Sequence, residues 1–175
     1  MPDIRFASNL DRDDINGVYM QAFPESENKA VADLAVALLA ETHEMINLIV
    51  ESNGLLVGHV AFSPLKADTK ENWKGYILAP LAVKPEYQGK GIGAKLIESG
   101  VEQLKEKSVD MLFVYGDPKY YERFGFKVET AKSFTPPYKL TYSSGWQAMM
   151  LNQNFVCEGE AKLSCVAALC NLALW

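Results

Sequence analysis

The chain has little cysteine and little histidine, and neither is arranged for metal or disulfide chemistry. Its three cysteines, Cys157, Cys165 and Cys170, all fall in the last 20 residues, and it contains only two histidines. An odd number of cysteines without a C-x-x-C pair argues against a disulfide framework and against a zinc site. We therefore expect no metal, and free thiols in a reducing compartment.

Long apolar runs and clusters of basic residues are also missing. No apolar run reaches the length of about 18 residues that a membrane-spanning helix needs. The N-terminus, Met1-Pro2-Asp3-Ile4-Arg5, lacks the basic and then apolar layout of a secretion signal. The net charge of −5 and the absence of a Lys/Arg cluster disfavour nucleic-acid binding. We expect a cytoplasmic protein with no membrane and no nucleic-acid partner.

The 175 residues suit one domain with a sizeable core. Hydrophobic periodicity predicts a mixed α/β sheet in the order β-α-α-β-β-β-α-β-α-β-β. The expected strands cover 4–7, 46–51, 55–62, 76–83, 111–115, 126–128 and 146–151. Helices are expected where apolar residues recur at helical spacing over 15–23, 31–39 and 92–104, and a short helix over 118–124. Asn9 or Asp11 can cap the first of these helices, and Pro24 ends it. Asn53-Gly54 between two strand-like runs indicates a β-hairpin. Residues 66–74 are expected to form a charged loop.

The last twenty residues, 156–175, give the weakest pattern. Leu163, Val166, Cys170 and Leu174 fit one face of a helix, yet short strand pairing fits nearly as well. We expect residues 1–155 to form the domain and 156–175 to pack on it as a tail. Trp175 would then be a packing anchor, with a dimer contact as the alternative.

A glycine-rich turn joins the strand that ends at Val83 to the helix that follows. The turn reads Gln88-Gly89-Lys90-Gly91-Ile92-Gly93-Ala94. Glycines allow positive φ and a close approach of the backbone, and a helix N-terminus presents N–H groups and partial positive charge to an anion. The turn therefore favours a phosphate or pyrophosphate. It is neither a P-loop, since the Lys-Ser/Thr ending is absent, nor G-x-G-x-x-G, since Ala94 replaces the last glycine.

This turn resembles the acyl-CoA pyrophosphate loop (Gln/Arg-x-x-Gly-x-Gly/Ala) of the GCN5-related N-acetyltransferase superfamily. A second segment, Gly116-Asp117-Pro118-Lys119-Tyr120-Tyr121-Glu122-Arg123-Phe124-Gly125-Phe126, resembles the strand end, short helix and Gly-Phe pair of that superfamily. Its sequence is similar to that of a poorly characterised bacterial branch. The resemblance covers roughly residues 3–151 and implies the acyl-CoA N-acyltransferase fold, with a central, mostly antiparallel sheet and helices on both faces.

The resemblance also implies a set of site residues, with acetyl-CoA as co-substrate. Main-chain groups of Leu81, Ala82 and Val83 would bind the acetyl and pantetheine parts, and one N–H would polarise the thioester. The backbone amides of 89–94 would surround the pyrophosphate, with Gln88 bracing the turn and Lys90 adding charge or simply facing water. Tyr121 would protonate the leaving thiolate, because a phenol with a pKa near 10 is protonated at neutral pH. Asp117 departs from the Asn that many members carry near that position.

No general base can be assigned from the sequence. The strand before the glycine turn has no carboxylate, and Glu86 in the turn reads as a solvated charge. His59 can titrate near neutral pH, although a lone strand histidine is more often structural. A relay of waters is our default. Glu25 and Glu27, in the linker that borders the acceptor site in this superfamily, are candidate substrate contacts, and Tyr120 is a candidate lining residue.

The sequence is thus interpreted as an N-acetyltransferase that uses direct attack of a primary amine in a ternary complex. The acceptor, a small molecule or a protein amine, stays open, and the resemblance suggests a homodimer. A non-catalytic acyl-CoA-binding or regulatory module is the main alternative, because the strand before the turn lacks a carboxylate. A transferase of longer or acidic acyl groups is a third, weaker interpretation.

Overall fold

The computed structural model describes residues 2–41, 44–69 and 72–175, and the chain divides into two compact units. The first unit comprises residues 1–62 and 79–100, and the second residues 63–78 and 101–175. Strands β3 (Leu55–Ala67) and β4 (Gly75–Val83) and helix α3 (Ile92–Glu106) run through both units.

In the first unit, β1 (Asp3–Phe6), β2 (Ile46–Ser52) and β3 form an antiparallel meander, with β4 beside β3. The predicted hairpin is confirmed: Asn53 (φ +52°) and Gly54 (φ +76°) form the turn between β2 and β3. The partners of Val50 and Glu51 are Gly58 and Leu56, so Val57 is the extra residue of a β-bulge.

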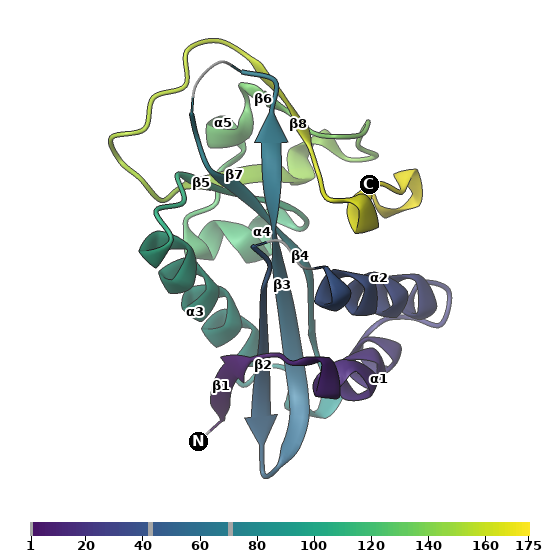
Figure 1. Cartoon of the computed structure of the whole chain (residues 1–175). Helices are drawn as coiled ribbons and strands as arrows, with labels where there is room; N and C mark the ends of the chain where they lie inside the picture. Colours follow the sequence, from purple (N-terminus) through teal and green to yellow (C-terminus); the bar gives the residue numbers. More distant parts are fainter. Residues whose placement is uncertain (1, 42–43, 70–71) are drawn as a thin grey trace. The chain divides into compact units, whose positions relative to one another are not determined.

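Helices cover both faces of this first sheet segment. Helix α1 (Arg12–Ala22) and helix α2 (Asn28–Ala40) lie on one face and α3 on the other (Figure 1). Adjacent residues of β3 show why. Gly58 faces α3, where an added Cβ would lie 3.2 Å from Leu96, while His59 faces α1 and contacts Tyr19. Buried residues of α1 and α2 form the core on that face together with Ile49, Leu56 and Ala82.

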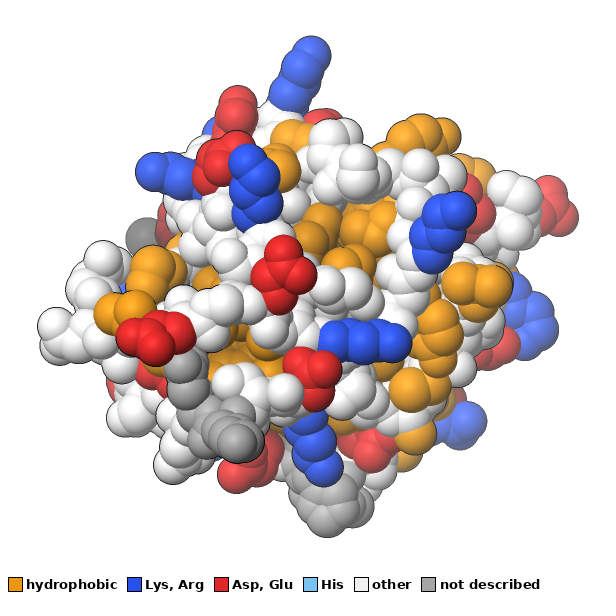
Figure 2. Space-filling model, turned by 90° about the horizontal axis from the view of Figure 1, so that it is seen from above, with side chains coloured by type: hydrophobic (Ala, Val, Ile, Leu, Met, Phe, Trp, Pro, Cys, Tyr) orange, Lys and Arg blue, Asp and Glu red, His pale blue; other side chains and the backbone are white. Residues whose placement is uncertain are grey.

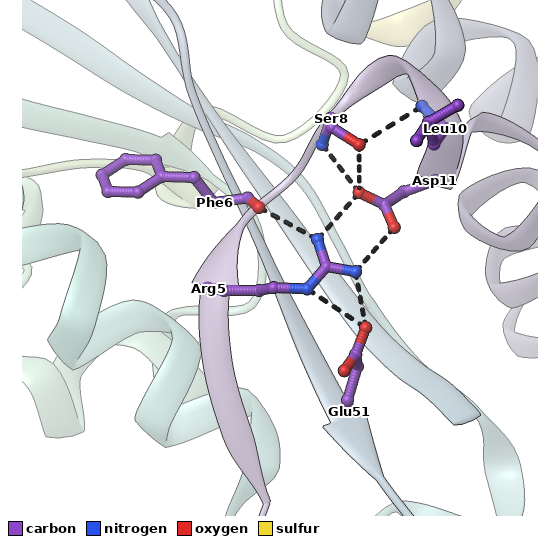
Figure 3. A network of polar contacts seen from close by, with 6 residues as sticks. All are labelled: Arg5, Phe6, Ser8, Leu10, Asp11 and Glu51. Atoms are coloured by element: carbon purple, nitrogen blue, oxygen red, sulfur yellow. Dashed lines mark hydrogen bonds and ion pairs between the residues drawn. The ribbon is translucent and has the colours of Figure 1, made fainter. Parts of the chain in front are cut away.

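An ion-pair network fixes the start of the chain to this sheet (Figure 3). The Arg5 guanidinium donates to both carboxylate oxygens of Asp11, at 2.9 and 2.8 Å, and also to Glu51 on β2. Asp11 in turn accepts the Ser8 N–H at 2.7 Å, as the second half of a capping box at the short 3₁₀ helix Asn9–Asp11. The bond from Arg5, opposed by partial burial, lowers the pKa of Asp11 below its usual value.

In the second unit, the first part of β4 pairs in parallel with β5 (Met111–Tyr115), and β5 pairs antiparallel with β7 (Trp146–Met150). Strand β8 (Ala161–Ser164) pairs with β3 and with the two-residue β6 (Phe134–Thr135). Short helices α4 (Pro118–Tyr121) and α5 (Val128–Ala131) precede β6, and 3₁₀ turns η5 (Ala167–Leu169) and η6 (Leu172–Leu174) end the chain.

Two expectations for this unit need correction. Residues 126–128 are not a strand: only Lys127 bridges Ala148, and α5 begins at Val128. The charged loop starts later than expected, because β3 continues to Ala67 and pairs with β8; residues 70–71 of that loop lie outside the described part. Of the two alternatives for the tail, short strand pairing is the one found: the tail forms β8 and two 3₁₀ turns. The pairing of β3 with β8 overrides the local pattern of both segments.

Candidate active site

The turn after β4 is held by hydrogen bonds of its own. The Lys84 N–H donates to the carbonyl of Val57, the bulged residue of β3, at 2.9 Å. A short 3₁₀ turn, Pro85–Tyr87, follows, and the Gln88 side chain then donates to the Val83 carbonyl at 2.9 Å. Gln88 therefore closes the turn back onto the end of β4, which is the geometry its expected bracing role requires.

Two glycines give the turn its shape. Gly89 and Gly91 have φ of +72° and +78°, values that are strained for any residue with a Cβ. Apart from the adjoining residues of the chain, no heavy atom of the described residues lies within 4 Å of the position an added Cβ would occupy at either glycine. Positive φ, and not crowding by neighbouring atoms, therefore explains why glycine is needed at these two positions. Open space is left beside their backbone.

The N–H groups at the start of α3 are available to a ligand. The first α-helical hydrogen bond runs from the Lys95 N–H to the Gly91 carbonyl at 3.1 Å. The N–H groups of Ile92, Gly93 and Ala94 therefore lie in the first turn, where the helix itself supplies no acceptor. Within the described residues, no side chain or loop carbonyl accepts from the amides of 89–94. Lys90 lies beside them, donating to the Glu86 carbonyl at 2.9 Å over the Tyr87 ring.

Strand β4 extends beyond its parallel partner. Their pairing runs from Gly75 with Met111 to Leu78 with Val114, and β5 ends at the next residue, Tyr115. Strand β4 continues to Val83, so this register leaves Leu81, Ala82 and Val83 beyond the end of β5. Their main-chain groups on that edge have the arrangement that an extended ligand needs in order to pair as a neighbouring strand.

The segment after β5 positions Tyr121 in the second unit. The Asp117 carboxylate accepts from the Lys119 N–H at 3.0 Å and caps α4, and Pro118 occupies the first helical position. Asp117 therefore performs a capping role that an asparagine could also perform. Gly125, with φ of +98°, ends the following 3₁₀ turn.

The ring of Tyr121 is fixed by close packing while its hydroxyl stays unengaged. The ring lies against the Gly116 backbone, where an added Cβ would be 2.5 Å from Cε2. Phe126 and Tyr120 contact it edge-on, with centroids at 5.7 and 5.0 Å. Among the described residues the hydroxyl has no hydrogen-bond partner. Burial, and secondarily the neighbouring Tyr120, raise the pKa of Tyr121 above its usual value, which already leaves a phenol protonated at neutral pH.

Comparisons with known proteins agree with this geometry. A family model described as an acetyltransferase (GNAT) domain matches residues 44–128, which include the glycine turn and Tyr121. YjhQ of Escherichia coli K12, an uncharacterized N-acetyltransferase, is 36% identical over 140 residues, which cover 74% of this chain and 72% of that protein. The chain belongs to the GNAT acetyltransferase family. The predicted acyltransferase class of enzyme is thereby confirmed.

Solved GNAT structures confirm the predicted fold. A GNAT N-acetyltransferase of Escherichia coli, YhbS, solved in complex with CoA, matches with a TM-score of 0.80 and 27% identity, over 92% of this chain and 88% of that one. A GNAT acetyltransferase of Brucella melitensis, solved with acetyl-CoA, matches with a TM-score of 0.76 and 29% identity, over 96% and 97% of the two chains.

His59 is more deeply buried than expected for a residue of a half-buried strand. It is fully buried in the GNAT core, its Nδ1 is 2.8 Å from the Tyr19 hydroxyl, and its Nε2 is 3.1 Å from Asn47 Oδ1. Because Asn47 Oδ1 can only accept, Nε2 carries the proton and Nδ1 accepts from Tyr19. Burial lowers the pKa of His59 to about 3. A neutral imidazole with both nitrogens engaged suits a structural role, so we do not carry His59 forward as a base.

The remaining candidates lie at the surface. Glu25 and Glu27 are exposed in the linker between α1 and α2, and Glu86 is exposed in the turn before α3. Tyr120 is half-buried under the Arg123 guanidinium, 4.7 Å from its ring centroid, and burial raises its pKa. The location of these side chains does not decide whether they contact the substrate. For Glu25, Glu27 and Tyr120 that contact stays a prediction.

Sequence reasoning missed two residues that shape this region. The sequence places Gly116 in a turn, and the structure adds that its lack of a side chain makes room for the Tyr121 ring. The sequence places Val57 in a regular strand, whereas in the structure Val57 forms a bulge and its carbonyl accepts the Lys84 N–H after the end of β4. The role of Gly116 could have been suggested by a glycine just before the Asp-Pro start of a helix. No local feature of the sequence indicates the bulge at Val57.

The surface of the molecule carries charges of both signs. On the face seen in Figure 2, acidic and basic side chains are interspersed, with hydrophobic side chains between them. In the described part of the chain, no helix is long and apolar enough to cross a membrane, and no group of three or more His, Cys, Asp or Glu could hold a metal ion.

Proposed function

We propose that this GNAT protein transfers an acetyl group from acetyl-CoA to a primary amine by direct attack in a ternary complex. The observation that carries the proposal is the row of unengaged amides at the start of α3, behind Gly89 and Gly91. The CoA and acetyl-CoA complexes of the related GNAT structures support the choice of donor.

Each proposed residue has one task. Amides of 89–94 bind the pyrophosphate, and the free edge of Leu81–Val83 binds the pantetheine and polarises the thioester carbonyl. The neutral amine attacks that carbonyl carbon, the C–S bond then breaks, and Tyr121 gives its proton to the departing thiolate. Water returns a proton to the phenolate and removes the proton of the amine. A thioester is already activated, so orientation and charge stabilisation suffice without a covalent enzyme intermediate.

The donor site can be tested with a matched pair of glycine variants. Gly91 and Gly54 both have positive φ (+78° and +76°), and both have open space where a Cβ would be. Gly91→Ala and Gly54→Ala should therefore carry a similar backbone strain of about 1–2 kcal/mol. We expect calorimetry to show CoA affinity lowered about tenfold or more in Gly91→Ala, because the amides move, and unchanged in Gly54→Ala.

Equal CoA affinity in the two variants would contradict the role of the turn. Absence of CoA or acetyl-CoA binding by the unmodified chain would overturn the whole proposal. The acceptor is best sought with a panel of small amines, polyamines, amino sugars and peptides, with released CoA as the readout. A panel of acyl-CoA donors would show whether acetyl is preferred over longer or acidic acyl groups.

The absence of a carboxylate in β4 favours one second candidate, a non-catalytic acyl-CoA-binding module on the same fold. Such a module binds CoA through the same turn but releases none with any amine. Family membership supports the enzyme, and turnover on any member of the panel would decide for it. A cytoplasmic location and a homodimer also belong to the proposal, to be checked by cell fractionation and by light scattering.

A further inference from the structure

Two of the three cysteines face one another near the C-terminus, in the second unit. Cys165 follows β8, Cys170 follows the 3₁₀ turn Ala167–Leu169, and their sulfur atoms are 3.7 Å apart. This is a weak hydrogen-bonding contact between two thiols, in which either sulfur can be the donor. Cys157 is not part of the pair; its sulfur lies 3.9 Å from the Gly159 carbonyl.

The backbone brings these sulfurs together without a covalent link. The Leu169 N–H donates to the Val166 carbonyl and the Cys170 N–H to the Ala167 carbonyl, both at 3.0 Å. The Cys170 thiol also lies 3.5 Å from the Val166 carbonyl and 3.7 Å from the Cys165 carbonyl, positions that suit a weak S–H donor. A disulfide would need only a side-chain rotation and a small backbone adjustment within a turn that is already closed.

The two thiols differ in access, which assigns them different roles. Cys170 is exposed and Cys165 is half-buried. An incoming oxidant reaches the Cys170 sulfur first, and the Cys165 sulfur stands behind it in contact. This is the arrangement of an attacking thiol with a resolving thiol.

The turn that carries the thiols also anchors the end of the chain. The Leu169 carbonyl accepts the indole N–H of Trp175 at 3.0 Å, and Leu169 itself is buried. The Trp175 ring stacks on Tyr115, the last residue of β5, with centroids 6.4 Å apart and planes at 15°. Tyr138 packs on the same indole at 6.0 Å. The six residues from Cys165 to Cys170 therefore fix the carbonyl on which this aromatic anchor depends.

We propose that Cys165 and Cys170 form a reversible disulfide that fixes the Trp175 anchor in its place on Tyr115 and Tyr138. The proposal is independent of acetyl transfer. It makes the tail a site of thiol oxidation, with a low-molecular-weight disulfide such as oxidised glutathione as the oxidant.

The exchange balances in two steps. The Cys170 thiolate attacks one sulfur of the small disulfide, forms a mixed disulfide and releases one small thiolate. Cys165 then loses its proton to solvent and attacks the Cys170 sulfur, which expels the second small thiolate. The chain loses two protons and two electrons, and the small disulfide is reduced to two thiols. Excess small thiol reverses both steps.

Protonation controls the rate of the second step. Burial, reinforced by the hydrogen bond with Cys170 and its proximity, raises the pKa of the Cys165 thiol to about 12. Since the thiolate is the nucleophile, a protonated Cys165 makes closure of the disulfide slow at neutral pH. Closure accelerates as pH rises.

The test uses the full chain equilibrated with mixtures of reduced and oxidised glutathione at pH 8, followed by alkylation and peptide mass mapping. We expect the unmodified chain and Cys157→Ser to form an internal link that removes two hydrogens from the peptide carrying Cys165 and Cys170. We expect Cys165→Ser to stop at the glutathione adduct of Cys170, and Cys170→Ser to stay largely unmodified at Cys165.

Hydrogen exchange provides the structural readout. In the oxidised chain, the amides of 171–175 should exchange at least about fivefold more slowly than in the reduced chain, because the anchoring turn opens less often. The Cys165→Ser chain should show no such slowing under the same oxidising mixture. Persistent alkylation of both thiols, a link through Cys157, or exchange that is unchanged on oxidation would each overturn the proposal.

Discussion

Burial raises the pKa of Tyr121 in the second unit and lowers the pKa of His59 in the first. It disfavours the phenolate of Tyr121, a side chain that is protonated at neutral pH in any case, and it disfavours the imidazolium of His59, so that side chain gives its proton up. The hydroxyl of Tyr121 has no partner among the described residues, whereas both nitrogens of His59 are engaged. The free hydroxyl suits the proton donor that we propose for Tyr121, and the full pairing of His59 suits a structural role.

The largest expected effect comes from removing the free hydroxyl. Tyr121→Phe keeps the ring and its contacts with Phe126 and Tyr120 but cannot protonate the thiolate. We expect kcat to fall by about 10²–10⁴-fold, the usual contribution of a positioned general acid. CoA affinity by calorimetry should stay within about twofold, because the donor is bound by backbone amides.

His59→Gln is the counterpart for this comparison, and its kcat per folded molecule should be close to that of the unmodified chain. If Tyr121→Phe retained full turnover, Tyr121 would lose its proposed role. Both Tyr121 and His59 would then be structural residues.

A smaller effect should follow from displacing the same ring. An added Cβ at residue 116 would lie 2.5 Å from Tyr121 Cε2, so Gly116→Ala must shift the ring. A displacement of this kind at a proton donor should lower kcat by about tenfold or more. A double-mutant cycle separates this from general damage: in the Tyr121→Phe background, Gly116→Ala should add little to the loss of kcat. Additive losses would show that Gly116 acts elsewhere.

The sequence predicted what depends on local chemistry. The glycine turn, the Asn53-Gly54 hairpin and the end of α1 before Pro24 follow from backbone preferences of the residues themselves, and all three are found where expected. The resemblance carried by the turn and by the segment around Tyr121 indicated the acetyltransferase family, and the relatives confirm that family for the chain.

What the sequence did not predict depends on distant partners. The bulge at Val57 exists because β2 and β3 pair out of step, and the buried pairing of His59 requires Tyr19 from α1 and Asn47 from β2. Residues 126–128 have the alternation of a strand, but only Lys127 finds a partner. The hydrophobic pattern predicts that a residue is buried. It does not predict with which polar atoms that residue forms hydrogen bonds.

The smallest expected effect concerns His59 and is a dependence of the stability of the chain on pH. The pKa of His59 is lowered to about 3 in the folded chain from a reference value of 6.5, so the unfolded chain binds more protons between these values. Stability from this group is complete above pH 6.5 and is lost as pH falls. The free energy of unfolding from urea titrations should therefore drop by up to about 1.4 kcal/mol per pH unit between pH 6 and 4.5.

Two variants show whether His59 is the source of that slope. His59→Gln removes the titrating ring and should flatten the pH dependence between 6 and 4.5, at the cost of a lower stability at pH 7. Asp11→Asn removes a group whose folded pKa is also lowered, but from 3.8, so its contribution is lost only in more acidic solution and the slope above pH 4.5 should persist. An unaltered slope in His59→Gln would mean that the buried ring does not titrate on unfolding as its environment requires.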